Sequence, residues 1–345
     1  MKRTIIALSL VSTAFALSAA PAATQESGDV RNDRMILERG RLLTGWLFDS
    51  RADSISERMA ERYRSALGGA EGVARSVRSI SGQLGQEEDV EQEAAFTRTS
   101  DDHYYRIARY AGAPATTITV HWAWNEAGEI TYLRVQPTPE PAVTGHEDYR
   151  TKAELTLPFE GAWYVFWGGR EPHLNHHVRA PAQRFAYDFL VLENGRSHTG
   201  TGGSNEDYHC FGRPILAPAA GRVTDVVDTV PDNSPGEMNE EAPAGNHVVL
   251  DHGGGEHSVL AHLRRNSVIV EEGDRVEAGR RLGACGNSGR SSEPHLHYHL
   301  QTEPEFGEGV GLPASFHDYI ADGELMERGE PMRDQVIRPA PEDGG

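Results

Sequence analysis

The sequence lacks the features that mark several large classes of protein. Its 345 residues include only two cysteines, Cys210 and Cys285, so no C-x-x-C pair is present and a structural zinc knuckle is excluded. Acidic residues outnumber basic ones by 52 to 33, and a net charge of −19 makes nucleic acid a poor partner, because phosphate binding needs a basic patch. No G-x-S-x-G motif is present, which argues against the serine hydrolases that carry this nucleophile turn.

Long apolar runs are absent except at the N-terminus. Lys2 and Arg3 precede an uncharged apolar stretch over residues 4–17, and Ala20-Pro21-Ala22 forms a small-residue cleavage site. The pattern predicts a signal peptide over residues 1–22 with cleavage near Ala22. The alternative is a retained membrane anchor, for which the apolar stretch is short. We therefore expect a soluble periplasmic or secreted protein without stable membrane insertion.

Residues 30–136 have the pattern of a small α+β domain. Residues 34–69 are predicted to be helical, because Ile55, Met59, Tyr63 and Leu67 recur every four residues. Three segments rich in β-branched and aromatic residues follow at 104–110, 116–124 and 130–135, which predicts an antiparallel sheet. The order is similar to that of cystatin/NTF2-like modules, and the domain contains no catalytic motif.

A change in composition marks a second domain. A proline-rich segment at residues 137–150 is predicted to be a linker. Residues 151–322 contain many short apolar runs separated by glycines, which is typical of an all-β barrel or sandwich. The polar residues 323–345 are predicted to form a tail.

Histidines are concentrated in this second domain. Twelve of the 16 lie between His173 and His299, and the densest group is PHLHYH at residues 294–299. Alternate residues of a strand share a face, so His295 and His297 would point the same way, close enough to serve one metal site. Histidine is the commonest zinc ligand, although a polar strand face with solvated histidines would show the same pattern.

Several motifs occur around these histidines in a fixed order. They are GRPILAPAAG at 212–221, GNHVVLDH at 245–252, AHL at 261–263, VEEGDRVEAG at 270–279, GNSG at 286–289 and PHLH at 294–297. Together they resemble the lysostaphin/LytM-type zinc metallopeptidases, whose duplicated-hybrid-motif barrel carries the same succession. The resemblance covers roughly residues 160–302.

The resemblance implies roles for individual residues. His297 and Asp188 correspond to two ligands of one zinc ion, and His262 and His295 correspond to the two catalytic histidines that do not bind it. Where the family's H-x-x-x-D motif has its first ligand, this chain has Arg184, which stays protonated and cannot bind zinc. We expect His177 to replace it, with His176 as the alternative.

A second departure is an insertion of about 23 residues between Asp188 and Gly212, which we expect to form a loop near the site. The two cysteines are expected to pair in a disulfide if the protein is exported, and two buried thiols are the alternative.

The family resemblance implies an exported zinc-dependent endopeptidase that cleaves peptide bonds in bacterial peptidoglycan by attack of a zinc-bound water. The main alternative is a non-catalytic relative that activates a cell-wall amidase. The segment 270–279 also resembles a lipoyl-type carrier, but no lysine lies at an attachment turn. The sequence does not indicate an oligomeric state, and peptidoglycan peptides are the expected partner.

Overall fold

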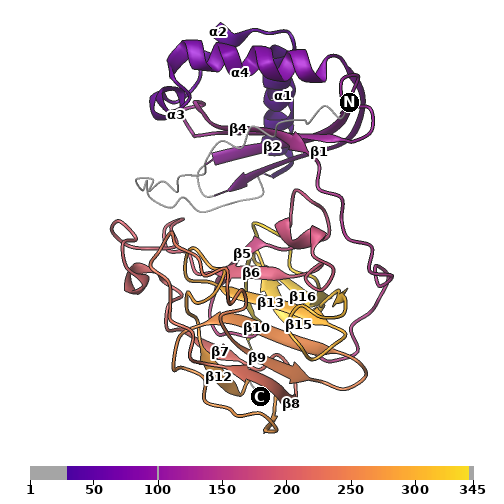
Figure 1. Ribbon diagram of the computed structural model, residues 1–345, viewed down its shortest axis with the longest axis vertical. Helices are drawn as coiled ribbons and strands as arrows, with labels where there is room; N and C mark the ends of the chain where they lie inside the picture. The colour runs from indigo at the N-terminus through magenta and orange to yellow at the C-terminus, as the bar shows by residue number, and fades with distance from the viewer. Residues whose placement is uncertain (1–28, 99–100, 342–345) are drawn as a thin grey trace. The chain divides into compact units, whose positions relative to one another are not determined.

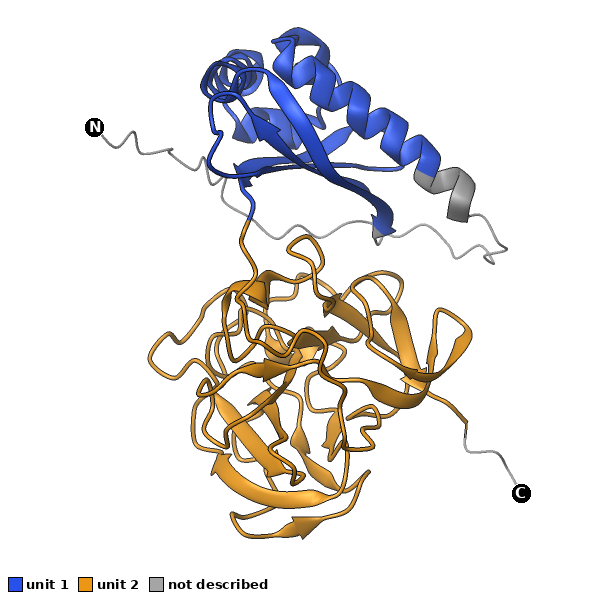
Figure 2. Cartoon of the chain, turned by 90° about the vertical axis from the view of Figure 1, so that its right-hand side faces the viewer, with its two compact units in different colours: residues 1–138 blue, residues 139–345 orange. Residues whose placement is uncertain are grey.

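The computed structural model describes residues 29–98 and 101–341. The chain divides into two compact units, residues 1–138 and residues 139–345 (Figure 2). The predicted signal peptide lies outside the described residues. Within the described ranges, no helix combines the length and apolar character needed to cross a bilayer.

Unit 1 consists of helices packed on one face of an antiparallel sheet (Figure 1). The helices are α1 (Asp29–Phe48), α2 (Ala52–Ser56), α3 (Glu61–Ala66) and α4 (Gly69–Leu84). The strands, in the order β1-β2-β3-β4, are β1 (Glu87–Arg98), β2 (Asp101–Tyr110), β3 (Ile118–Trp124) and β4 (Ile130–Pro137). Helices followed by an antiparallel sheet agree with the predicted α+β order.

Residues 34–69 are mostly helical, as predicted, but they are divided among α1, α2 and α3. The chain leaves the helical conformation after Phe48, where Ser50 has a positive φ of 58°, and again at Gly68, whose φ of 86° precedes α4. These breaks allow α4 to pack its own apolar face, with Val73 and Val77 buried, beside α2 and α1. Sequence periodicity missed α4 and the acidic edge strand β1.

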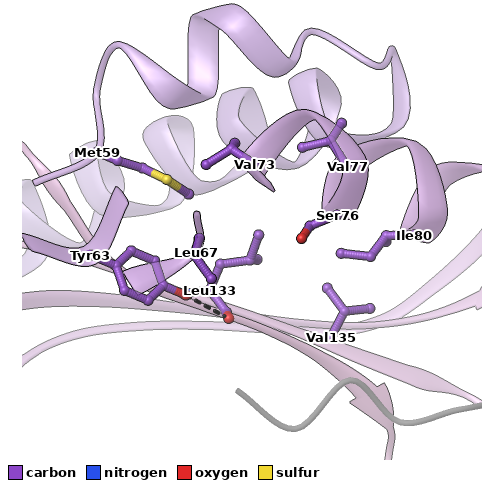
Figure 3. A pocket seen from close by; sticks show the side chains of 9 residues that line it. All are labelled: Met59, Tyr63, Leu67, Val73, Ser76, Val77, Ile80, Leu133 and Val135. Carbon is purple, nitrogen blue, oxygen red and sulfur yellow. Dashed lines mark hydrogen bonds between the residues drawn. The ribbon is translucent and has the colours of Figure 1, made fainter. Parts of the chain in front are cut away.

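The core of unit 1 is built on large aromatic side chains of the sheet. Trp122 is fully buried, and its indole N–H donates to the hydroxyl of Thr44 on α1 (3.1 Å). Gly40 lets α1 approach the sheet, because a Cβ there would lie 2.0 Å from the Tyr104 ring. A small apolar cavity of about 30 Å³ lies among α3, α4 and β4, where the Tyr63 hydroxyl donates to the Leu133 carbonyl (3.1 Å; Figure 3).

A charged network joins α1 to β1 and β2. The carboxylate of Glu93 accepts hydrogen bonds from Arg41, Tyr104 and Arg106, and Arg106 also pairs with Glu87 (2.5 Å). Burial by itself would raise the pKa of Glu93, but these hydrogen bonds and the charges of both arginines lower it to about 2.

Unit 2 is an all-β structure, as expected for the second domain. Its large antiparallel sheet runs in the order β11-β8-β9-β10-β13-β6-β5-β17-β15-β16, and β14 also pairs with β13. The site uses β6 (Tyr187–Leu190), β9 (Asn246–Asp251), β10 (His257–Leu263) and β13 (Leu296–Gln301). The remaining strands are β5 (Trp163–Trp167), β8 (Gly221–Val227), β11 (Arg275–Val276), β14 (Gly311–Leu312), β15 (Phe316–Ala321), β16 (Glu324–Gly329) and β17 (Val336–Pro339), with β7 (Pro214–Leu216) and β12 (Arg281–Ala284) forming a separate pair.

The prediction of a polar tail from residue 323 is wrong for residues 323–339. Strand β16 pairs with β15, and β17 lies between β15 and β5 with Ile337 fully buried. Most of β16 is exposed, so its composition resembles that of a loop. The missed signal is Asp322-Gly323, whose positive φ values of 50° and 93° form a two-residue hairpin turn.

Cys210 and Cys285 are free thiols in this structure, and both are buried. Their sulfur atoms lie 3.0 Å apart, and Cys210 Sγ also donates to the Pro294 carbonyl (3.0 Å). The predicted disulfide is therefore not formed here, although the fold brings the two sulfurs together.

Candidate metal centre and active site

The site begins with two side chains that face each other across neighbouring strands. Asp188 on β6 is the register partner of His297 on β13. Both side chains are buried, and His297 Nδ1 lies 2.9 Å from Asp188 Oδ1. The antiparallel pairing thus joins residues that are 109 positions apart in the chain.

The short 3-10 helix η1 (His176–Arg179) brings a second histidine to the same carboxylate. His177 Nε2 lies 3.6 Å from Asp188 Oδ2, and the His177 and His297 rings are 4.9 Å apart. Candidate ligand atoms of His176, His177 and Asp188 all lie within 4.8 Å of one another. Both residues left open by the sequence are therefore near Asp188, and burial and hydrogen bonding distinguish them.

Asn175 orients the ring of His177 through two hydrogen bonds. Asn175 is fully buried, and its amide nitrogen donates to the carbonyls of Gly169 (3.0 Å) and Ala186 (2.9 Å). Its oxygen must therefore face His177, where it accepts from the backbone N–H and from Nδ1, both at 3.0 Å. With the proton on Nδ1, His177 presents the bare Nε2 to Asp188. His176 is exposed and packs against Trp167 (4.9 Å).

The charge states of these groups suit a metal. Burial lowers the pKa of His177 well below its ordinary value, so the ring is neutral near pH 7. Burial would raise the pKa of Asp188, but the facing rings of His177, His295 and His297 hold it well below its ordinary value. A carboxylate and two imidazoles are three protein ligands of the types that zinc prefers, and ligands must be deprotonated to bind it. The residues present thus fit one zinc ion.

Two further histidines, His262 and His295, line the same site. The His262 and His295 rings lie 4.8 Å apart, and His262 is 5.6 Å from His297. His262 Nδ1 donates to the Ser288 carbonyl (2.9 Å), and His295 Nδ1 donates to the Glu293 carbonyl (2.8 Å). Because a carbonyl only accepts, each ring keeps a proton on Nδ1, so Nε2 is the atom that can exchange a proton. His295 Nε2 is 3.6 Å from Asp188.

The backbone at His262 is unusual for a strand. His262 has a φ of 61°, and the register between β10 and β9 shifts at this point. Such conformations cost about 1–3 kcal/mol and persist where the surroundings hold them. Ser288 of the GNSG turn helps to hold this backbone conformation. Its hydroxyl accepts from Asn246 N (2.8 Å) and donates to the Leu263 carbonyl (2.7 Å). Burial lowers the pKa of His262 well below its ordinary value, and the nearby rings of His295 and His297 add to this effect.

The structure also places the residues that depart from the family pattern. The guanidinium of Arg184 packs over the ring of Phe185 (4.8 Å). Among the described residues, Asp188 forms its ion pairs with His177, His295 and His297, and not with Arg184. The insertion after Asp188 approaches the segment that carries His295, because Ser197 donates to Glu293 (2.9 Å).

Some histidines and supporting residues fall outside the sequence prediction. The carbonyl of His173 accepts from the buried Arg333 (2.6 Å), and burial lowers the pKa of the His173 ring to about 4. His299 is fully buried beyond His297, and burial lowers its pKa to about 3, so its ring is neutral near pH 7.

Sequence reasoning missed Asn175 and Gln301, because an isolated amide beside a histidine forms no recognisable motif.

Comparison with known proteins supports the resemblance noted in the sequence. Residues 201–307 match Peptidase family M23, which confirms the resemblance of this part of the chain to the lysostaphin/LytM-type peptidases. The chain is 44% identical over 57 residues to "Peptidoglycan DD-endopeptidase ShyA" of Vibrio cholerae, covering 16% of this chain and 13% of that protein.

A second relative is "DD-carboxypeptidase/endopeptidase Mpg" of Neisseria meningitidis serogroup B. It is 30% identical over 126 residues, covering 36% of this chain and 25% of the relative. The chain therefore spans a quarter or less of the length of these two relatives. Among solved structures, the catalytic domain of the prophage-encoded M23 protein EnpA from Enterococcus faecalis matches with 22% identity and a TM-score of 0.29, covering 46% of this chain and 93% of that one.

Proposed function

We propose that this protein is a zinc-dependent endopeptidase that cleaves peptide bonds in bacterial peptidoglycan outside the cytoplasm. The observation that carries the proposal is the meeting of five side chains in one site. Asp188 faces His177 and His297, and these three residues would supply the three protein ligands of a catalytic zinc site. His262 and His295 lie beside it with free Nε2 atoms.

The chemistry divides between the metal and the two remaining histidines. Zinc supplies a Lewis acid that activates water and polarises the scissile carbonyl. His262 is buried and neutral, so its Nε2 can accept a proton, and its Nδ1–H bond to Ser288 keeps the ring in that orientation. His295 is held in the same tautomer by Glu293. Once protonated, either ring can donate through Nε2 to the developing oxyanion or to the leaving amine.

Peptidoglycan is proposed as the substrate because the relatives named above carry that substrate or the corresponding DD-peptidase activity in their names. The predicted signal peptide supports the same assignment, since peptidoglycan lies outside the cytoplasm. Removal of the signal peptide can be tested by measuring the mass of the protein purified from the cell envelope. The expected mass is that of a chain that begins at Ala23.

The decisive experiment measures release of soluble fragments from purified peptidoglycan by the zinc-loaded protein. Release should stop when a chelator is added and should be absent in Asp188→Asn. His317→Ala is a matched control, because His317 lies on β15 and pairs with Glu154 (2.9 Å) instead of with site residues. If the loaded protein cuts no peptidoglycan but stimulates a cell-wall amidase, the protein is the non-catalytic module instead.

A further inference from the structure

A chain of three buried side chains extends from the metal centre along β13. His297 Nε2 lies 2.9 Å from His299 Nδ1, and His299 Nε2 lies 2.9 Å from Gln301 Oε1. Alternate residues of a strand share a face, which is why these three side chains follow one another. Their exposed fractions are 3%, 1% and 0%, so water does not compete for these hydrogen bonds.

The far end of the chain fixes its direction. The amide nitrogen of Gln301 donates to the carbonyls of Glu303 (2.7 Å) and Glu305 (2.6 Å). Carbonyls only accept, so the amide oxygen must face His299 and can only accept from it. The neutral ring of His299 therefore carries its single proton on Nε2, and its Nδ1 is an acceptor.

This acceptor determines the proton position on His297. Nε2 of His297 must carry a proton to donate to Nδ1 of His299. In the neutral ring of His297, Nδ1 is therefore bare, and it faces Asp188 Oδ1 at 2.9 Å. Both atoms are then acceptors with lone pairs that face each other, which is the arrangement that a shared metal ion would satisfy. The chain thus prepares Nδ1 of His297 as a metal ligand.

We infer that Gln301, acting through His299, is a positioning residue that fixes the tautomer of His297 and so raises the affinity of the site for zinc. The inference rests on the proposed function, because it takes His297 as a zinc ligand. The loop after β13 supports the arrangement, since the Phe306 ring packs against His299 (5.7 Å). Gln301 holds the start of that loop through its two carbonyl contacts.

The test combines zinc affinity with a direct measurement of the tautomer. Gln301→Leu removes the oxygen that accepts from His299, and the zinc Kd should rise about 10–100-fold, as is typical when a partner of a metal ligand is lost. His299→Leu should have a similar effect. His299→Asn should restore much of the affinity, because its amide oxygen takes the place of Nδ1. His317→Leu is the matched control with an unchanged Kd.

Nitrogen NMR of the imidazole rings reports the tautomer in the wild-type protein, with and without zinc. We expect the Nε2–H form of His299 in both states, and loss of that preference in Gln301→Leu. An Nδ1–H form of His299 in the wild type would overturn the inference. An unchanged zinc Kd in Gln301→Leu would also overturn it and leave the proposed function standing. A protein that binds zinc with this tautomer but cuts no peptidoglycan would refute only the proposed function.

Discussion

Replacement of His177 by alanine tests the least familiar part of the proposed metal centre. The family's usual first ligand is absent, and the structure offers two adjacent histidines near Asp188. We expect His177→Ala to lose zinc and His176→Ala to keep it, because only the buried His177 has its ring oriented by Asn175. Peptidoglycan cleavage should follow zinc occupancy in both variants.

The size of the effect follows from the number of ligands. Structural zinc sites with four ligands bind with an apparent free energy of about 10–16 kcal/mol, or about 2.5–4 kcal/mol for each ligand. Loss of one of three ligands should therefore raise the zinc Kd by about 10²–10³-fold. Removal of the orienting group in Asn175→Ala should have a smaller effect of about 10–100-fold, because the ligand itself remains.

Competition with a chromogenic chelator measures these affinities directly, and circular dichroism checks that each variant is folded. The paired variants differ by one position in the chain, so general effects of the substitution cancel. Zinc loss in His176→Ala with retention in His177→Ala would reverse the assignment. Retention of zinc with wild-type affinity in both variants would refute the reasoning from Asn175.

Three further predictions concern catalysis, cysteine chemistry and acid stability. His262→Ala and His295→Ala should each keep zinc but lower the rate of cleavage by ~10²–10⁴-fold, and loss of zinc would show that the residue is a ligand instead. In an oxidising compartment Cys210 and Cys285 should join as a disulfide, passing two electrons and two protons to a thiol–disulfide oxidant and stabilising the fold by about 4 kcal/mol; two titratable thiols per denatured, unreduced chain would contradict this. Because the pKa of Glu93 is lowered in the folded state, its stabilising effect is present above about pH 4.5 and is lost as the pH falls towards 2. Glu93→Gln should therefore melt below the wild type at pH 7 but close to it at pH 2.5, and an equal difference at both values would count against this pairing.

Part of the site could be predicted from local sequence. The period of two in PHLHYH predicts that His295 and His297 point the same way; His297 lies on β13, and His295 directly precedes that strand. The order of the glycine-containing turns was equally informative, because GNSG supplies the Ser288 contacts that hold the backbone beside His262. These features depend on residues close together in the chain, and they carry the resemblance to the lysostaphin/LytM-type peptidases.

The remaining features depend on contacts between distant segments. The partnership of Asp188 with His297 is a matter of strand register, and the preference for His177 depends on Asn175, whose orientation is set by carbonyls at Gly169 and Ala186. No motif records such contacts. The strands after residue 322 were also missed, because an exposed edge strand needs few apolar residues and gains its stability from pairing with β15. The resemblance to a peptidase family and the types of residue in the site thus follow from local sequence. The contacts of Asp188 with His177 and His297 depend instead on the pairing of segments that the chain brings together only on folding.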